Sequence, residues 1–186
     1  MKVIAFVGSS RTDGNTSKVV GAVCAGMKES GHSVEICNLS ELDNKGCRAC
    51  GSCQAGKVEY CAVDDRVTAL LPKVADADCI VLGTPVYMMH LSGTAKNFID
   101  RLFAFYVQSN HTARCLPGKK YITVTCSGAP VGAFNNVTEY LNQLFEGAFQ
   151  MKNSGNIIVG NVLGKDDVLN QRDILKSAED VGRKLK

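Results

Sequence analysis

The sequence has no apolar run that approaches the roughly 20 residues of a membrane-spanning helix and no run of Lys or Arg. Its formal net charge is only +3 in 186 residues, which argues against a nucleic-acid-binding protein. The first apolar run is too short for a signal peptide and carries no cleavage pattern. We therefore expect a soluble, cytoplasmic protein with no membrane or nucleic-acid partner.

Linkers and internal repeats are also missing from the chain. A length of 186 residues with 45% hydrophobic residues is enough to bury the core of one domain. We therefore expect residues 1–186 to form a single domain.

Short apolar runs alternate with segments of helical periodicity. Strands are predicted at residues 3–7, 33–39, 79–83, 121–126 and 157–159. Helices are predicted with buried faces at 20–27, 67–74, 95–103, 137–145 and 174–185. Gly31 is expected to end the first helix, and Asp64 and Asp65 to begin the second. In the third helix, Asp100 and Arg101 are expected to form structural ion pairs. This alternation predicts an α/β, flavodoxin-like fold: a doubly wound, five-stranded parallel sheet of order 2-1-3-4-5.

The loop after the first strand is rich in hydrogen-bond donors and precedes a helix. It lacks both the Gly-x-Gly-x-x-Gly and the G-x4-G-K-[ST] patterns, which disfavours a pyrophosphate or a nucleoside triphosphate. A terminal monophosphate such as that of FMN fits better at such a helix N-terminus. The candidate phosphate ligands are Ser9, Ser10, Arg11, Asn15, Thr16 and Ser17. The same residue types also suit an ordinary turn and helix cap.

Two further loops follow strands three and four on the same edge of the predicted sheet. A flavin ring needs an apolar or aromatic face and backbone polar groups, and residues 84–88 can supply both. The candidates are Thr84, Pro85, Val86, Tyr87 and Met88 after strand three, and Ser127 and Gly128 after strand four. Tyr87 could alternatively be a core or interface aromatic residue, and we expect His90 to be a surface or packing residue.

Four of the nine cysteines crowd into a long loop after strand two, at about residues 40–63. Cys47, Cys50, Cys53 and Cys61 have the spacing C-x2-C-x2-C-x7-C. Four thiolates in one loop suggest an iron–sulfur cluster or a zinc ion, and free thiols are a third possibility. Zinc sites more often use separated C-x2-C pairs.

The other five cysteines lie outside this loop. Cys24, Cys37, Cys79 and Cys126 occupy apolar, periodic segments and are expected to be small buried residues. Cys115 lies in a polar segment, and nothing in the sequence gives it a function.

Three motifs in order resemble a known family. They are Gly-Ser-Ser-Arg-x4-Thr-Ser, Cys-x2-Cys-x2-Cys-x7-Cys-x2-Asp-Asp, and Gly-Thr-Pro-Val-Tyr followed by Ser-Gly-x2-Lys-x-Phe-x-Asp-Arg. Over residues 1 to about 130 the chain resembles the NADPH-dependent FMN reductase superfamily, and within it the iron–sulfur flavoprotein family.

The resemblance implies a flavodoxin-like fold, FMN at the strand ends and a homodimer or homotetramer. It implies phosphate binding by Ser9, Arg11, Asn15, Thr16 and Ser17, contact with the flavin ring by Pro85, Val86, Tyr87, Met88, Ser127 and Gly128, and ligation of a 4Fe–4S cluster by Cys47, Cys50, Cys53 and Cys61. The cysteine loop would lie on the flavin side of the sheet and reach a neighbouring subunit's FMN.

These observations predict a redox flavoprotein that transfers electrons between a 4Fe–4S cluster and FMN, with NAD(P)H or a ferredoxin-like protein as donor. The cofactors carry the chemistry, so no catalytic acid or base is nominated. One alternative is an NAD(P)H-dependent FMN or quinone reductase without a cluster. Another is a non-enzymatic binding or sensing protein that uses zinc or thiols.

Overall fold

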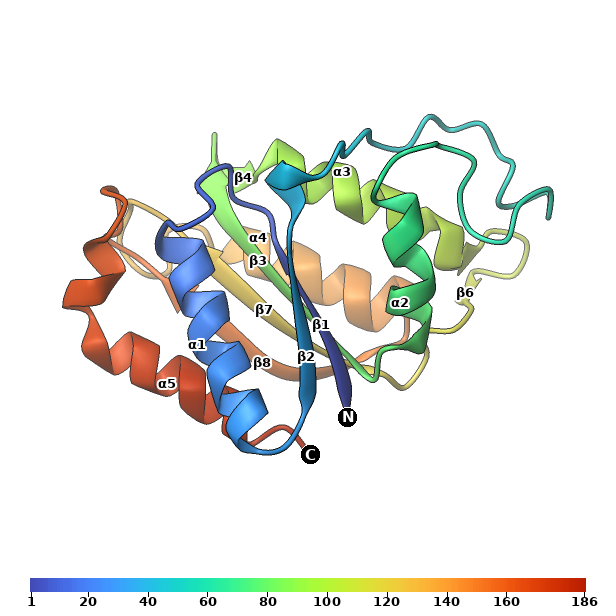
Figure 1. Ribbon diagram of the computed structural model, residues 1–186. Helices are drawn as coiled ribbons and strands as arrows, with labels where there is room; N and C mark the ends of the chain where they lie inside the picture. The colour runs from blue at the N-terminus through green and yellow to red at the C-terminus, as the bar shows by residue number, and fades with distance from the viewer.

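A central parallel sheet with helices on both faces forms the protein, and the computed structural model describes residues 1–186 (Figure 1). Its main strands are β1 (Lys2–Val7), β2 (Ser33–Asn38), β3 (Cys79–Tyr87), β7 (Lys120–Cys126) and β8 (Lys152–Val159). They lie in the order β2-β1-β3-β7-β8, and every neighbouring pair in this order is parallel. The predicted flavodoxin-like strand order is therefore confirmed.

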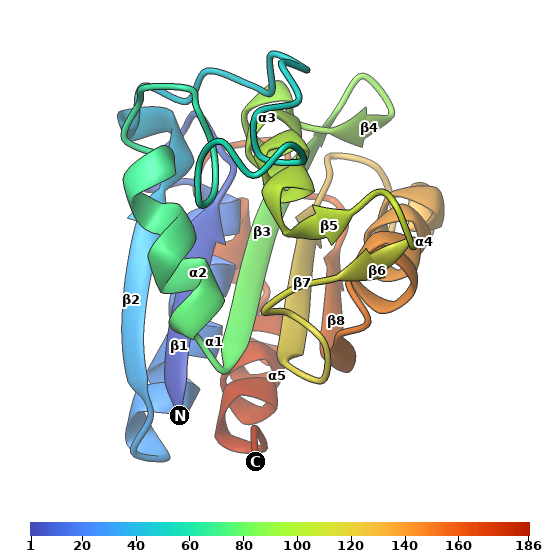
Figure 2. The same cartoon turned by 90° about the vertical axis from the view of Figure 1, so that its right-hand side faces the viewer.

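Each face of the sheet is covered by its own helices. One face carries α1 (Asn15–Glu29) and α5 (Arg172–Arg183), and the other carries α2 (Leu71–Asp76), α3 (Gly93–Arg101) and α4 (Asn135–Asn142) (Figures 1 and 2). Alternate residues of β1 point into the two layers: Ile4 and Phe6 belong to the core under α2–α4, and Val3, Ala5 and Val7 to the core under α1 and α5. This double burial explains why the central strands are continuous apolar runs.

Short elements connect the main ones. They are η1 (Leu39–Glu41), η2 (Thr68–Leu70), η3 (Leu102–Phe105), β4 (His90–Leu91), β5 (Tyr106–Val107), β6 (Thr112–Ala113), the π-helix η4 (Gln143–Ala148) and η5 (Asp167–Asn170). The β5–β6 hairpin and β4 were not predicted from the sequence. None of the helices is both long and apolar enough to cross a bilayer.

The local predictions have mixed outcomes. Gly31, with a φ of +81°, follows the end of α1 as expected. The second helix begins later than predicted: helical residues start at Thr68, and α2 starts at Leu71, because Pro72 cannot donate a hydrogen bond back into a preceding helical turn. Cys24, Cys79 and Cys126 are buried as predicted, but Cys37 is only partly buried, since β2 is an edge strand.

Helices α1 and α5 cross with their backbones almost in contact. A Cβ atom built on Gly26 of α1 would lie 2.0 Å from the carbonyl oxygen of Glu179. A Cβ atom built on Gly182 of α5 would likewise lie 2.0 Å from the carbonyl oxygen of Val23. Each glycine therefore faces the partner helix's backbone, which cannot move aside as a side chain can.

We predict that Gly26→Ala lowers the free energy of unfolding by about 1–3 kcal/mol, because the added methyl group forces α5 away from α1. Gly21→Ala is the matched control in the same helix, since nothing lies within 4 Å of its added Cβ atom. Higher helix propensity should make this variant neutral or more stable by up to about 1 kcal/mol. Urea denaturation of both variants checks the prediction, and equal stability of the two would contradict it.

Candidate functional site

A crevice of about 180 Å³ lies at the carboxyl ends of the strands. It is lined by Ser9, Arg11, Gly14, Asn15, Thr16, Pro85, Val86, Tyr87, Cys126, Ser127, Gly128, Val162 and Leu163. These residues come from the first turn of α1 and from the ends of, or the loops after, β1, β3, β7 and β8, next to the point where the strand order reverses between β1 and β3. Ligands of open α/β sheets bind at such a switch point.

Most of the predicted FMN-binding residues line this crevice, but Ser10, Ser17, Thr84 and Met88 do not. Ser10 lines a separate surface pocket beside η1, and the Ser17 hydroxyl donates to the carbonyl oxygen of Arg11. The side chain of Met88 is exposed, with 96% of the residue's surface accessible.

Thr84 is fully buried, and its hydroxyl helps to position the loops that form the crevice. Its hydroxyl accepts a hydrogen bond from the backbone N–H of Ser92 and donates one to the carbonyl oxygen of Pro85. The Ser92 hydroxyl in turn caps α3 by accepting from the Ala95 N–H, and it donates to the carbonyl oxygen of Gly8. These contacts hold the loops after β1 and β3 together.

The N-terminus of α1 forms one end of the crevice. No side chain caps this end, and its first turn contains no acidic residue. The first N–H groups of a helix have no carbonyl partner inside the helix and carry a partial positive charge. Thr16 is buried at this end and Arg11 adds a full positive charge, so the donor set fits a phosphate dianion.

The loop after β8 completes the crevice and was not predicted from the sequence. Asn15 holds this loop: its amide donates to the carbonyl oxygen of Gly164 at 2.6 Å, and its side-chain oxygen accepts from the N–H of Val168 at 3.1 Å. Val162 and Leu163 therefore reach the crevice wall. One feature of the sequence could have indicated this contribution: Val162 and Leu163 form an apolar pair between Gly160 and Gly164, directly after a strand.

The cysteine loop leaves the same edge of the sheet but extends away from the crevice. From Leu42 to Val67 the chain has neither helix nor strand, and it passes over α3 and the β5–β6 hairpin (cyan to green in Figures 1 and 2). The four cysteines of the motif all line one cavity of about 260 Å³. No three His, Cys, Asp or Glu side chains converge closely enough to hold a metal ion.

Polar donors lie near the sulfur atoms of Cys47 and Cys53. The N–H of Ala49, a residue with a φ of +51°, lies 3.4 Å from the sulfur of Cys47. The Gln54 amide nitrogen lies 3.9 Å from the sulfur of Cys53. Such donors stabilise metal-bound thiolates. The cavity and its donors therefore fit a thiolate-ligated iron–sulfur cluster or zinc ion.

The thiol of Cys50 is exposed and faces Ser52, whose hydroxyl oxygen lies 3.5 Å from the sulfur. Hydrogen bonding from the side chain and then the backbone of Ser52 lowers the pKa of Cys50. A larger thiolate fraction favours metal binding, because the thiolate is the ligand.

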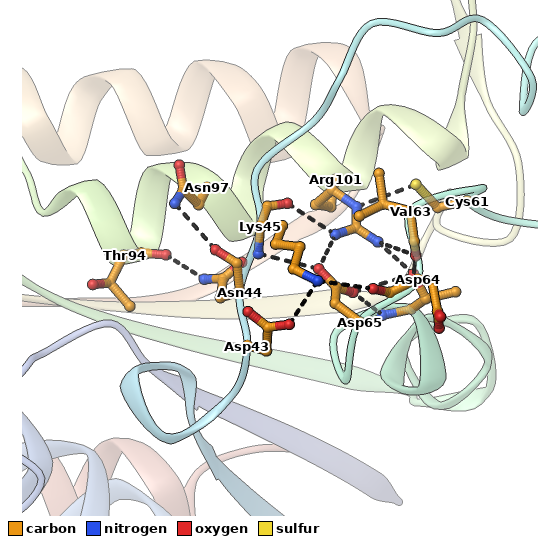
Figure 3. A network of polar contacts seen from close by, with 11 residues as sticks. Asp43, Asn44, Lys45, Cys61, Val63, Asp64, Asp65, Thr94, Asn97 and Arg101 are labelled. Carbon is orange, nitrogen blue, oxygen red and sulfur yellow. Dashed lines mark hydrogen bonds and ion pairs between the residues drawn. The ribbon is translucent and has the colours of Figure 1, made fainter.

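An ion pair between Arg101 and Asp65 anchors the loop (Figure 3). The two side chains are completely buried and lie 2.5 Å apart. Burial, the largest influence, would lower the pKa of Arg101, but Asp65 and Cys61 raise it above its usual value, so the guanidinium stays charged. Burial also raises the pKa of Asp65, but hydrogen bonds from Arg101 and from the Thr68 N–H outweigh this effect and leave that pKa below its usual value.

The expected ion pairs of the third predicted helix are thus present. Arg101 pairs with Asp65, and Asp100 pairs with Lys96 at 2.5 Å. The sequence did not indicate that Arg101 also contacts Cys61.

Comparison with known proteins identifies the family. Residues 1–163 match the NADPH-dependent FMN reductase family. Over its full length the chain is 30% identical to an iron–sulfur flavoprotein of Archaeoglobus fulgidus, of which it covers 79%. A second iron–sulfur flavoprotein of that organism is 36% identical over 54% of this chain, and one of Methanosarcina thermophila is 32% identical over 54%. The chain spans about half the length of these last two relatives, 48% and 52%.

Solved structures show the same fold at low sequence identity. An NAD(P)H:quinone oxidoreductase from Methanothermobacter marburgensis superposes with a TM-score of 0.78 at 16% identity, covering 100% of this chain and 99% of that one. An FMN-dependent NADH-azoreductase from Bacillus anthracis, solved in complex with FMN, gives 0.75 at 16% identity, covering 98% of each chain. The fold and the crevice define a flavodoxin-like protein. The chain belongs to the NADPH-dependent FMN reductase family, within its iron–sulfur flavoproteins.

We predict that Asp65→Asn lowers the free energy of unfolding at pH 7 by about 3 kcal/mol, because it leaves the buried charge of Arg101 unpaired. Since the folded-state pKa of Asp65 is lowered, its stabilisation is complete above the ordinary carboxyl pKa of about 3.9 and is lost as the pH falls through the folded-state value. The gap between variant and wild type in urea denaturation should therefore shrink at acid pH.

Asp76→Asn is the control, because it removes an exposed ion pair with Lys2 whose partners are 66% and 68% exposed. Solvent screens that pair, so little change in stability is expected at pH 7. Equal losses in the two variants would contradict the importance of the buried pair.

Proposed function

We propose that this protein is an FMN-dependent oxidoreductase that transfers electrons between a 4Fe–4S cluster in the cysteine loop and FMN in the crevice. One observation carries the proposal: a single chain has four cysteines around one cavity and, at the same edge of its sheet, a crevice that ends in an uncapped helix N-terminus. The names of its relatives and the family match support both cofactors.

The crevice residues would bind FMN in two parts. Ser9, Arg11 and Thr16 would hold the phosphate, together with the first N–H groups of α1. Pro85, Val86 and Tyr87 would contact the flavin ring on one side, and Ser127 and Gly128 on the other. Tyr87 is 45% exposed at the rim, where its ring can shield bound flavin from water.

Cys126 lines the crevice but belongs to neither cofactor's ligand set. Burial raises the pKa of its thiol to about 12, so it is neutral at physiological pH. The bound flavin supplies hydride and one-electron chemistry, and this neutral wall would place no fixed negative charge beside it.

In the cysteine loop, Cys47, Cys50, Cys53 and Cys61 would ligate the cluster, which supplies one-electron transfer. The same thiolates suit zinc chemically, and the names of the relatives favour the cluster. The family match disfavours a non-enzymatic binding or sensing protein.

The second candidate is an NAD(P)H-dependent FMN or quinone reductase without a cluster. The observation that favours it is that the four sulfurs line one cavity without converging on one point. The two functions differ in iron content, which can be measured directly.

Electron transfer between the two sites would involve a second subunit. No residue lines both the crevice and the cysteine cavity, so they are separate within one chain. An open apolar groove of about 450 Å³ adjoins the cysteine cavity, shares Cys47, Ala49 and Phe103 with it, and runs along α3 and α4. We propose that the protein assembles as a homodimer or homotetramer, in which the cluster of one subunit serves the FMN of another. NAD(P)H or a ferredoxin-like protein would be the donor.

Thr16→Val should weaken FMN binding about tenfold or more, because it removes a hydroxyl donor to the charged phosphate at little change in size. The affinity for riboflavin, which has no phosphate, should stay the same. Quenching of flavin fluorescence measures both affinities. Ser17→Ala is the matched control on the same helical turn, since its hydroxyl bonds to Arg11 outside the crevice. Equal loss of riboflavin and FMN affinity would contradict a phosphate site here.

Anaerobically purified protein should show flavin absorption bands above a broad cluster absorption, with about four iron atoms per chain. Replacing any one of Cys47, Cys50, Cys53 or Cys61 with Ala should remove or severely deplete the iron and leave FMN bound. Cys115→Ser is the control, because Cys115 is exposed and does not line the cavity. Flavin without iron would support the cluster-free reductase, and zinc in place of iron would exclude electron transfer through this loop.

A further inference from the structure

The side chain of Arg101 touches one of the four motif cysteines. It is the last residue of α3, and its Nε lies 3.2 Å from the sulfur of Cys61 (Figure 3). Arg101 lies 40 positions from Cys61 in the sequence, so the contact depends on the fold.

All five N–H donors of this guanidinium are used. Nε donates to the sulfur of Cys61; Nη1 donates to the carbonyl oxygen of Lys45 and to Asp65; and Nη2 donates to the carbonyl oxygen of Val63 and to the Thr68 hydroxyl. The side chain is completely buried, so water cannot replace any of these partners. The Nε–H group of Arg101 has the Cys61 sulfur as its one partner.

Asp65 fixes the orientation of the guanidinium. One of its carboxylate oxygens accepts from Arg101 and from the Lys45 N–H at 3.1 Å, and the other accepts from the Thr68 N–H at 2.9 Å. The carboxylate is as fully bonded as its partner, so the guanidinium cannot rotate without breaking several buried hydrogen bonds.

The same guanidinium binds both ends of the cysteine loop. Lys45 lies two residues before the first motif cysteine, and Val63 lies two residues after the last. Arg101 therefore sets the separation between the segment that enters the cysteine motif and the segment that leaves it.

We propose that Arg101 is a positioning residue for the Cys61 ligand of the iron–sulfur centre, and that its buried N–H donor, oriented by Asp65, raises the reduction potential of that centre. The inference rests on the proposed function, because it needs the cluster. One-electron reduction adds a negative charge to a thiolate-ligated centre, so a hydrogen bond to a ligand sulfur favours the reduced form.

Substitution of Arg101 and substitution of Asp65 are expected to change the reduction potential in opposite directions. Arg101→Lys keeps the positive charge but loses the planar set of five donors, so the hydrogen bond to the sulfur is lost and the potential should fall. Asp65→Asn keeps a side chain of similar size with one acceptor oxygen but removes the negative charge, which leaves the positive charge of Arg101 uncompensated. The potential of that variant should rise.

The experiment is a reductive titration of anaerobically purified holoprotein with dithionite, followed by electron paramagnetic resonance of the reduced cluster. Iron release to a chelator is measured on the same samples, and it should be several-fold faster in Arg101→Lys than in the wild type. Arg114→Lys is the matched control: Arg114 also bonds this loop, through the carbonyl oxygen of Glu59 at 2.7 Å, and it makes no bond to a sulfur. Its potential should equal that of the wild type.

A purely structural role would destabilise the cluster in both variants and leave the potential of any remaining cluster unchanged. Wild-type potentials in Arg101→Lys and Asp65→Asn would therefore overturn this inference and leave the proposed function standing. Wild-type protein without iron would overturn both.

If a single variant does not retain iron, the double variant Asp65→Asn/Arg101→Gln decides. It removes both buried charges together and so avoids an unpaired one, while the shorter side chain at position 101 loses the donor to Cys61. A lowered potential supports the inference, and a wild-type potential overturns it.

Discussion

The buried pair of Arg101 and Asp65 is the interaction on which the cysteine loop most depends. Removing two charges from water costs much of what their attraction returns, so such a pair is stable only when every donor and acceptor is satisfied. Here the surrounding partners are mostly backbone groups of the loop itself. A segment with no helix or strand between Leu42 and Val67 is thereby joined to the end of α3 by polar contacts that replace regular secondary structure.

The parallel sheet determines where the two candidate cofactor sites lie. Because its strands all end at one edge, the loops that follow them meet there, and the N-terminus of α1 contributes a positive partial charge to the crevice. The cysteine loop begins at the same edge but is held on α3, with Gln54 donating to the carbonyl oxygens of Phe103 and Tyr106. Separation of the two sites within one chain follows directly from this anchoring.

Much of the fold could be predicted from the sequence, because strands buried on both faces are continuous apolar runs with polar loops at their ends. The same reasoning placed Ser9, Thr16 and Ser127 at the crevice, since the ends of parallel strands converge. The contribution of Leu163 could not be predicted, because it depends on the bond from Asn15 to the loop after β8. The contact between Arg101 and Cys61 has no local signal, because it joins residues that only the tertiary structure brings together.

The two candidate sites differ in how much of their geometry the polypeptide determines alone. In the crevice, Thr84 and Ser92 fix the loops with buried hydrogen bonds, so the polypeptide forms the shape of the crevice by itself. In the cysteine loop the anchors hold the ends, near Lys45 and Val63, while Cys47 and Cys50 are exposed between them. Metal binding supplies free energy that orders its own ligands. The polypeptide therefore fixes the two ends of the loop and the Cys61 sulfur, and binding of the proposed cluster would order the remaining thiolates.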